Sequence, residues 1–336
     1  DREFGRFLVA LKDAGVYEDA LILFVADHGE AFLDHGRWLH GRSVFVELIR
    51  VPLGHKLPGT RHAGRRVAGQ VQGVDIGPTI MEALELPLPP GLAGQPLQRA
   101  IENEAPERAA LSEISHRGFV AFGVRTDADK FVRRFSPDSD ELLFDLIEDP
   151  GEQVNVIADR AERARLLEAR GEEAMSPSPY RYVVQVAGSD RYGLRLETRG
   201  WIEDVEASGF GEDEPWSVEA NGRRLQLEAQ PRAGTVREVT FTVRPLGVPV
   251  MLSGTRDGQP LEPGQVAIAG SSWHPPSLPW RLPDVESEAE REGGLDLFVP
   301  PTNEAPGVRV WMTLPEGQSL MELDETDRER LRALGY

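Results

Sequence analysis

The chain contains no cysteine among its 336 residues. This absence excludes disulfide bonds and a cysteine nucleophile within the chain, and it leaves the cellular compartment open. Long hydrophobic runs are also missing, because no apolar stretch approaches the roughly 20 residues that a helix needs to cross a bilayer. We therefore expect no membrane span in this chain.

Basic residues are scarce relative to acidic ones. The sequence has 37 Lys and Arg against 56 Asp and Glu, which gives a formal net charge of −19. This balance argues against non-specific binding of nucleic acid, which needs clustered positive charge. An anionic substrate would need positive charge from a bound metal ion. The simplest interpretation of the acidity itself is solubility.

The first half of the chain alternates helical and extended patterns. At 336 residues, the chain is long enough for two domains of roughly 100–200 residues each. The patterns predict a helix at 1–14, a strand at 21–26, a helix at 44–49, strands at 51–57 and 70–73, and a helix capped by Asp75. An antiparallel meander follows at 109–115, 118–125, 130–135 and 141–146, and then a helix at 158–173. This order indicates an α/β layer with a small antiparallel sheet.

The second half has a different pattern. Residues 175–180 are rich in Ser and Pro and are predicted to form a linker, while apolar and polar residues alternate over 181–318. A period of two, interrupted by Gly and Pro turns, predicts an all-β, sandwich-like domain. We expect an acidic loop at 287–294 and a tail over 319–336 with a charged helix at 324–334.

A Gly- and His-rich segment follows the strand predicted at 21–26. It reads Asp27-His28-Gly29-Glu30-Ala31-Phe32-Leu33-Asp34-His35-Gly36-Arg37-Trp38-Leu39-His40-Gly41. A carboxylate and an imidazole that leave a strand at its carboxyl end stand where open α/β sheets bind ligands. Because Gly29 permits a turn, Asp27 and His28 can reach one metal ion. The alternative is that Asp27 caps a turn and His28 is a satisfied polar residue.

Four segments in this order resemble the sulfatases of the alkaline phosphatase superfamily. They are Asp27–Gly41 with Glu47-Leu48-Ile49-Arg50-Val51-Pro52-Leu53, then Gly73-Val74-Asp75-Ile76-Gly77-Pro78-Thr79-Ile80, then Leu143-Phe144-Asp145-Leu146-Ile147-Glu148-Asp149-Pro150-Gly151-Glu152, and finally Leu331-Arg332-Ala333-Leu334-Gly335-Tyr336. The resemblance implies that residues 1–174 are the C-terminal portion of a catalytic domain, with a partial alkaline-phosphatase-like sheet. Residues 181–318 would then be an accessory β domain.

The resemblance also implies a function. A metal-dependent sulfuric ester hydrolase would attack the ester with a formylglycine nucleophile, and its substrate would be a sulfate ester, such as one on a glycan. Asp27 and His28 would hold a divalent metal, with Ca²⁺ as the first choice; Mg²⁺, Mn²⁺ and Zn²⁺ also suit oxygen and imidazole ligands. By family resemblance, the location would be periplasmic, extracellular or membrane-anchored.

Four further side chains receive roles. In relatives, a Lys or His at the position of His40 contacts the sulfuryl group or the leaving oxygen, so His40 is our candidate for proton donation and substrate binding. His35 would line the pocket and bind substrate, or else brace the loop. Asp34 and Glu30 would fix the loop through backbone N–H groups. The remaining histidines match no motif and are expected to be structural or exposed: His55, His62, His116 and His274.

The nucleophile is the point of departure from the family, which uses a Cys/Ser-x-Pro-x-Arg motif. Pro179 and Arg181 have the right separation, but Pro177 occupies the nucleophile position, so this match fails. Residue 1 falls within a predicted helix. We therefore expect the nucleophile and further metal-binding Asp residues in an N-terminal half of the same fold, and this chain alone to be inactive.

Two alternative functions stay open. One is a phosphoester or phosphonate hydrolase, or a phosphoglycerol-type transferase, of the same superfamily. The other is a non-catalytic protein that binds a carbohydrate or a partner. Five of the six tryptophans lie in the second half and could stack on sugar rings, although core packing is the simpler interpretation: Trp201, Trp216, Trp273, Trp280 and Trp311.

Overall fold

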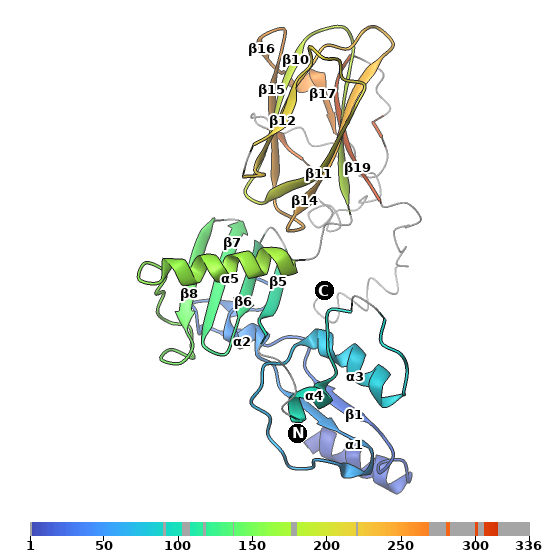
Figure 1. The fold of residues 1–336 in the computed structure, drawn as a ribbon, viewed down its shortest axis with the longest axis vertical. Coiled ribbons are helices and arrows are strands. Elements are labelled where there is room, and N and C mark those ends of the chain that lie inside the picture. The colour runs from blue at the N-terminus through green and yellow to red at the C-terminus, as the bar shows by residue number, and fades with distance from the viewer. Residues whose placement is uncertain are drawn as a thin grey trace. The chain divides into compact units, whose positions relative to one another are not determined.

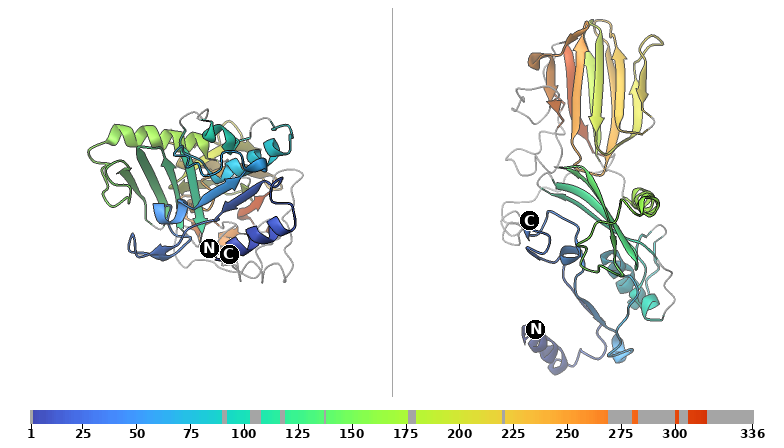
Figure 2. Two further views of the ribbon diagram at one scale, coloured as in Figure 1. Left: turned by 90° about the horizontal axis from the view of Figure 1, so that it is seen from below. Right: turned by 90° about the vertical axis from the view of Figure 1, so that its left-hand side faces the viewer.

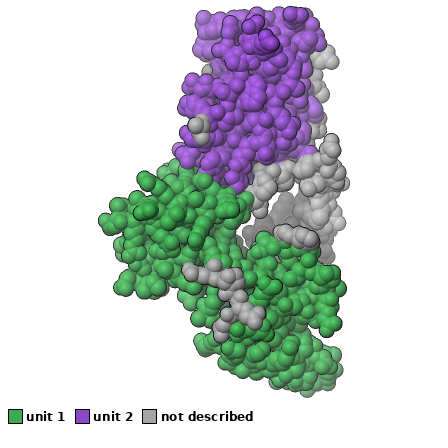
Figure 3. All heavy atoms as spheres, in the orientation of Figure 1, with its two compact units in different colours: residues 1–175 green, residues 176–336 purple. Residues whose placement is uncertain are grey.

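A computed structural model describes residues 2–89, 92–102, 108–116, 119–136, 138–175, 180–219, 221–268, 280–282, 300–301 and 306–314. The chain divides into two compact units, residues 1–175 and 176–336 (Figure 3). The acidic loop predicted at 287–294, the tail at 319–336 and most of the predicted linker lie outside the described residues. No helix in the described ranges has the length and apolar character that a membrane span requires.

The first unit opens with helix α1 (Arg2–Asp13) and a two-stranded antiparallel sheet of β1 (Ile22–Val25) and β4 (Leu53–Lys56). These elements confirm the helix and the two strands that the apolar spacing predicts, and they lie beside the N-terminus in Figure 1. Between the strands come a small hairpin, β2 (Ala31–Phe32) with β3 (Trp38–Leu39), and helix α2 (Val46–Ile49). The sequence predicts the helix but not the hairpin.

The segment after β4 departs from the prediction. It contains two 3₁₀ turns, η1 (Pro58–Thr60) and η2 (Gly73–Asp75), so the strand predicted at 70–73 is wrong. Helix α3 (Ile76–Ala83) follows as predicted, and α4 (Leu97–Ile101) is an additional short helix. A segment this rich in Gly and charged residues has no alternating apolar pattern from which a strand could gain burial.

Asp75 has a different role from the predicted one. It stands at the N-cap of α3, but its side chain makes no capping hydrogen bond to that helix. The buried carboxylate instead accepts hydrogen bonds from the backbone N–H groups of Gln72 at 2.8 Å and Gln95 at 3.0 Å, and it pairs with Arg108. Asp75 therefore ties three separate stretches of chain together.

The predicted meander is confirmed as a four-stranded antiparallel sheet. Its strands lie in sequence order: β5 (Ala110–His116), β6 (Phe119–Arg125), β7 (Asp129–Ser136) and β8 (Asp140–Asp145). Helix α5 (Ala161–Ala174) lies across one face of this sheet (Figures 1 and 2). A Cβ atom on Gly171 would stand 2.4 Å from the ring of Phe122, so a glycine is needed for this close approach.

The second unit is a sandwich of two sheets, which confirms the predicted class. One sheet has the strand order β12-β13-β10-β15-β16, with β18 also paired to β15, and the other has the order β11-β14-β9-β19-β17. The strands are β9 (Arg181–Ala187), β10 (Tyr192–Thr198), β11 (Trp201–Ser208), β12 (Trp216–Val218), β13 (Arg224–Ala229), β14 (Val236–Arg244), β15 (Val250–Arg256), β16 (Gln259–Pro260), β17 (Val266–Ile268), β18 (Trp280–Arg281) and β19 (Gly307–Thr313), with a 3₁₀ turn η3 at Pro263–Gln265.

The tryptophans of this unit divide between core and surface. Trp311 is buried and packs against Val183, as expected for the core, whereas Trp216 is exposed. Trp273 and the side chain of Trp280 lie outside the described residues. The predicted interpretation as core packing is therefore confirmed for Trp311.

Candidate active site

Asp27 and His28 emerge together just after the carboxyl end of β1. The backbone N–H of His28 donates to Asp27 Oδ1 at 2.9 Å, and His28 Nδ1 lies 2.8 Å from the carbonyl oxygen of Gly29. Because a carbonyl can only accept, Nδ1 carries the proton and the neutral ring keeps its lone pair on Nε2. That nitrogen lies 3.9 Å from Asp27 Oδ2.

Gly29 sets the geometry of this pair through close packing. Its N–H donates to the carbonyl of Leu48 at 2.8 Å, and a Cβ atom at position 29 would stand 1.9 Å from the carbonyl oxygen of Glu47. The glycine is therefore required because the backbone of α2 lies against it. The sequence predicts a permissive turn here, and the structure gives a different physical reason for the same residue.

The β2–β3 hairpin returns the chain to the same place. Ala31 pairs with Leu39 and Phe32 with Trp38, and Asp34 Oδ2 accepts the N–H of Phe32 at 3.0 Å, as predicted for Asp34. As a result, the imidazole rings of His28 and His40 lie with their centroids 4.2 Å apart. Twelve residues separate them in the sequence, so the hairpin is what brings the metal-ligand candidate and the proton-donor candidate together.

Glu30 orients His40. His40 Nδ1 lies 3.2 Å from Glu30 Oε2, and since an ionised carboxylate only accepts, Nδ1 donates and Nε2 is left for a substrate atom. This contact replaces the backbone bond predicted for Glu30. The other oxygen, Glu30 Oε1, is buried without a hydrogen-bond partner in the described part of the chain. An orphaned acceptor beside two imidazoles fits a cation or a donor group at this position.

His35 has the geometry of a brace. Its Nδ1 contacts the Glu47 carboxylate at 3.0 Å and its Nε2 lies 2.9 Å from the Glu152 carbonyl oxygen. The ring stacks on Phe45 at 3.9 Å with an interplanar angle of 6°, and only 10% of the His35 side chain is exposed. Both ring nitrogens are therefore engaged within the protein. Of the two predicted roles, this geometry supports the brace, and substrate binding by His35 stays a prediction.

The brace continues into a buried ionic cluster that the sequence reasoning does not single out. Glu152 Oε2 accepts from Lys130 Nζ at 2.7 Å and from the N–H of Val46 at 3.0 Å, while Lys130 Nζ also donates to the Val44 carbonyl at 2.5 Å. Burial lowers the pKa of Lys130 to about 8, and the charge of Glu152 opposes this shift. The cluster connects α2 and the loop that carries His35 to Lys130 of β7. A Lys within an apolar strand was the signal available in the sequence.

The donor set suits a divalent metal in part. Metal–ligand distances are roughly 2.0–2.6 Å for oxygen and imidazole ligands, so two atoms 3.9 Å apart can bind one ion. The Gly29 carbonyl fixes the His28 tautomer in the way that supporting hydrogen bonds orient metal-bound imidazoles. Within the described ranges, no three His, Asp or Glu side chains gather as a complete metal site. Asp27 and His28 therefore stay the two candidate ligands that the sequence predicts.

The nucleophile motif needs a correction. Ser277, Pro279 and Arg281 also have the Ser-x-Pro-x-Arg spacing, a match that the sequence analysis misses, and the expectation of a nucleophile upstream of this chain stays a prediction. Ser277 to Pro279 lie outside the described residues, and the backbone of Trp280 and Arg281 forms β18 at the edge of a sandwich sheet. This match belongs to the second unit, whereas Asp27, His28 and His40 belong to the first.

The first unit combines helices with sheets and places Asp27 and His28 just after the end of β1, as the resemblance to sulfatases predicts. Residues 34–172 match the family described as N-sulphoglucosamine sulphohydrolase, C-terminal. The resemblance of this part of the chain to sulfatases is therefore confirmed.

Individual relatives match about half of this chain. An arylsulfatase of Clostridium perfringens is 31% identical over 175 residues, which cover 49% of this chain and 35% of the relative. A solved structure in complex with its substrate D-glucosamine-2-N,6-O-disulfate is 25% identical and has a TM-score of 0.46, covering 50% of this chain and 36% of that one. A phosphonate monoester hydrolase of Agrobacterium radiobacter is 32% identical with a TM-score of 0.43, covering 50% and 37%. The chain spans about a third of the length of the arylsulfatase.

Proposed function

We propose that this chain belongs to a metal-dependent sulfuric ester hydrolase, in which Asp27 and His28 bind a divalent cation and His40 protonates the leaving oxygen. The observation that carries the proposal is the convergence of three side chains: Asp27 Oδ2 stands 3.9 Å from His28 Nε2, and the His28 and His40 rings lie 4.2 Å apart. The sulfatase relatives of the same segment support the reaction class.

The residues of this chain would divide the work as follows. A bound cation, with Ca²⁺ as our first choice, would neutralise the sulfate ester and stabilise the negative charge that develops during hydrolysis. Glu30 holds the Nδ1–H of His40 and so fixes the plane of the ring. Protonated His40 would then deliver its Nε2 proton to the oxygen of the departing alcohol, which otherwise leaves as an alkoxide. The contact between His35 and Glu47 holds the β2–β3 hairpin against α2.

The nucleophile and the remaining metal ligands would come from sequence outside this chain. Two ligands in the described part of the chain support this view, as does the length of the arylsulfatase relative. The location proposed for such an enzyme is periplasmic, extracellular or membrane-anchored, and its substrate class is a sulfated glycan. The matching family, described as N-sulphoglucosamine sulphohydrolase, C-terminal, supports a sugar as the substrate.

The test is made on the enzyme extended upstream to include a nucleophile. Asp27→Asn keeps the shape of the side chain and removes the ligand charge, so turnover of an aryl sulfate should fall by roughly three orders of magnitude, which corresponds to about 4 kcal/mol of transition-state stabilisation. Asp19→Asn is the matched control, because Asp19 is an exposed carboxylate before β1. Near-normal turnover by Asp27→Asn would refute the metal assignment. Faster turnover of a phosphonate monoester than of the sulfate would refute the substrate class.

A further inference from the structure

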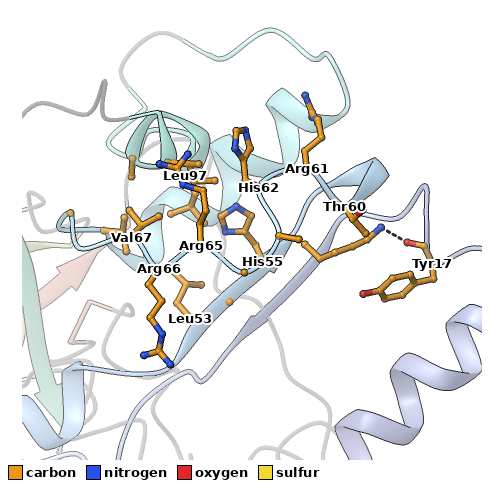
Figure 4. A pocket seen from close by; sticks show the side chains of 18 residues that line it. Tyr17, Leu53, His55, Thr60, Arg61, His62, Arg65, Arg66, Val67 and Leu97 are labelled. Atoms are coloured by element: carbon orange, nitrogen blue, oxygen red, sulfur yellow. Dashed lines mark hydrogen bonds between the residues drawn. The ribbon is translucent and has the colours of Figure 1, made fainter.

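A cavity in the first unit is lined by none of the residues that form the candidate active site. It has a volume of about 740 Å³ and runs along β4, the segment 60–71 and helix α4 (Figure 4). Its lining follows β4 from Leu53, which pairs with Val25, to Lys56, which pairs with Ile22 at the end of the β1–β4 ladder remote from Asp27. We call this cavity the basic pocket.

The lining of the basic pocket has one sign of charge. Six of its side chains are basic and none is acidic, although the whole chain carries a net charge of −19. The six are Lys56, Arg61, Arg65, Arg66, His55 and His62. An electropositive cavity on an acidic protein attracts anions and raises their local concentration.

The arginines of the pocket differ from most others in the protein. Arg134, Arg160 and Arg224 each pair with one or more carboxylates. In contrast, the guanidinium groups of Arg61, Arg65 and Arg66 have no hydrogen bond or ion pair within the described residues. A guanidinium offers five donors in a planar fork that suits sulfate and phosphate oxygens, so three such groups remain available for an external anion.

The histidines and the backbone of the pocket support the same interpretation. The pKa of His55 is lowered, first by burial and then by the charge of the neighbouring His62. Thr60 and His62 both have left-handed backbone conformations, with φ of 53° and 59°. Such conformations cost of order 1 kcal/mol or more for a residue with a side chain, and they cluster at binding sites.

The shape of the lining distinguishes between kinds of anion. Figure 4 shows Arg61, Arg65 and Arg66 fanning out around the neighbouring rings of His55 and His62 instead of converging on one point. A single compact anion could reach only part of this set. Several anionic groups spaced along one molecule could meet all of it.

The aromatic content argues against nucleic acid as that molecule. Tyr17 is the one Phe, Tyr or Trp side chain in the lining, and its ring is covered by the ammonium groups of Lys12 at 4.7 Å and Lys56 at 4.6 Å. Binding of single-stranded nucleic acid relies on free aromatic rings for base stacking. A sulfated sugar needs cations and hydrogen-bond donors but no such ring.

We propose that the basic pocket binds the sulfate groups of a polysulfated oligosaccharide, at a site separate from Asp27, His28 and His40. This choice of ligand rests on the proposed function, because an enzyme that hydrolyses one sulfate ester of a glycan meets further sulfates on the same chain. Arg61, Arg65 and Arg66 would supply the charge, and the pocket would retain the glycan while the candidate active site acts on another residue of it.

The test measures binding by the full 336-residue chain without any turnover. The probe is a fluorescein-labelled dextran oligosaccharide sulfated on most hydroxyls, followed by fluorescence anisotropy, with the unsulfated oligosaccharide of equal length beside it. The triple change Arg61→Ser, Arg65→Ser and Arg66→Ser should weaken binding at least tenfold and reduce the salt dependence of the affinity, because fewer counterions are released. The matched control is Arg165→Ser with Arg170→Ser, two exposed arginines of α5.

Each outcome bears on the proposal. Binding by the triple variant within twofold of the unmodified chain would overturn it, as would equal affinity for the unsulfated oligosaccharide. Preference for single-stranded DNA of equal charge would overturn the choice of a sugar. Should the triple variant fail to fold, the single change Arg66→Glu provides the same comparison. Turnover by Asp27→Asn in the extended enzyme tests the hydrolase proposal separately, so a failure of that proposal can be told apart from a failure of the pocket.

Discussion

Two regions of the first unit bury their apolar residues to very different extents. The β5–β8 sheet and α5 cover one another, and Phe122, Phe131 and Leu167 are fully buried between them. Helix α1, in contrast, has no buried residue at all, and Phe24 of β1 is 44% exposed. Burial stabilises by about 25 cal/mol for each Å² of apolar surface, so the free energy of unfolding must reside mainly in the first of these regions.

The candidate site belongs to the less buried region but is fastened to the more buried one. Asp27, His28 and His40 lie on β1 and the hairpin, while the contacts that hold this segment in place run through His35, Glu47 and Glu152 to β7. Functional segments are commonly drawn from the part of a protein with low local stability. The ionic cluster around Glu152 is therefore the connection that a mutation should break first.

The largest effect is expected from Glu152→Gln. The change leaves Lys130 buried beside a neutral amide, and loss of one partner of a buried ion pair costs about 3–5 kcal/mol. Hydrogen exchange of β7 peptides, read by mass spectrometry, should show this loss in local free energy, with the β9 and β14 peptides of the second unit as an internal reference. Glu173→Gln is the matched control, since Glu173 is exposed on α5. A loss below 1 kcal/mol would show that the cluster does not hold the two regions together.

A pair of leucines provides the next comparison. Leu167→Ala should cost about 2–5 kcal/mol, because it opens a cavity in a closed core. Leu8→Ala in α1 should lower the free energy of unfolding by less than about 1 kcal/mol. The helix buries none of its residues, so the smaller side chain leaves no enclosed cavity at position 8. The same hydrogen-exchange experiment measures both. Equal losses would mean that the difference in burial between the regions does not determine their stability.

The sequence predicted both regions with equal ease, and this is where sequence reasoning reaches its limit. Helical spacing in 1–14 and apolar runs in 21–26 and 119–125 look alike, because periodicity reports which face is apolar and not what covers it. The meander and α5 were predicted because their contacts are between neighbours in the chain. How far the apolar residues of β1 are buried depends on contacts with residues distant in the sequence, which no local pattern predicts.

The candidate site divides in the same way. Asp27 and His28 were predicted because adjacent residues at a strand end need no long-range information. The His28–His40 approach depends on a two-residue-per-strand hairpin with Leu33 and Leu39 at positive φ, which has no glycine signal at those positions. The partners of Glu152 are over 20 residues away in the sequence, so no local pattern predicts the cluster. The arginines of the basic pocket become a candidate binding site only because the fold places them around one cavity.

The last effect we predict is a pH dependence that arises at Lys130, in the more buried region. Burial lowers the pKa of Lys130 to about 8 from the usual lysine value of 10.5, with Glu152, Arg125 and Glu47 as the charged groups around it. Between these two pH values the unfolded chain binds more protons at this lysine than the folded chain does, so raising the pH favours the folded state. The gain is about 1.4 kcal/mol per pH unit where the difference is complete.

Lys130→Met removes this titration and isolates it from other groups. The free energy of unfolding of the first unit can be followed by pulse proteolysis in urea, through peptides from residues 110–174, at intervals from pH 7.5 to 10.5. The unmodified chain should gain stability relative to Lys130→Met as the pH rises through this range. If the free energies of unfolding of the unmodified chain and of Lys130→Met change with pH in parallel, then burial in the folded state does not disfavour the charged form of Lys130. The Glu152 cluster would then be a hydrogen-bonded support for the candidate site without the burial of charge that distinguishes it from the exposed β1 region.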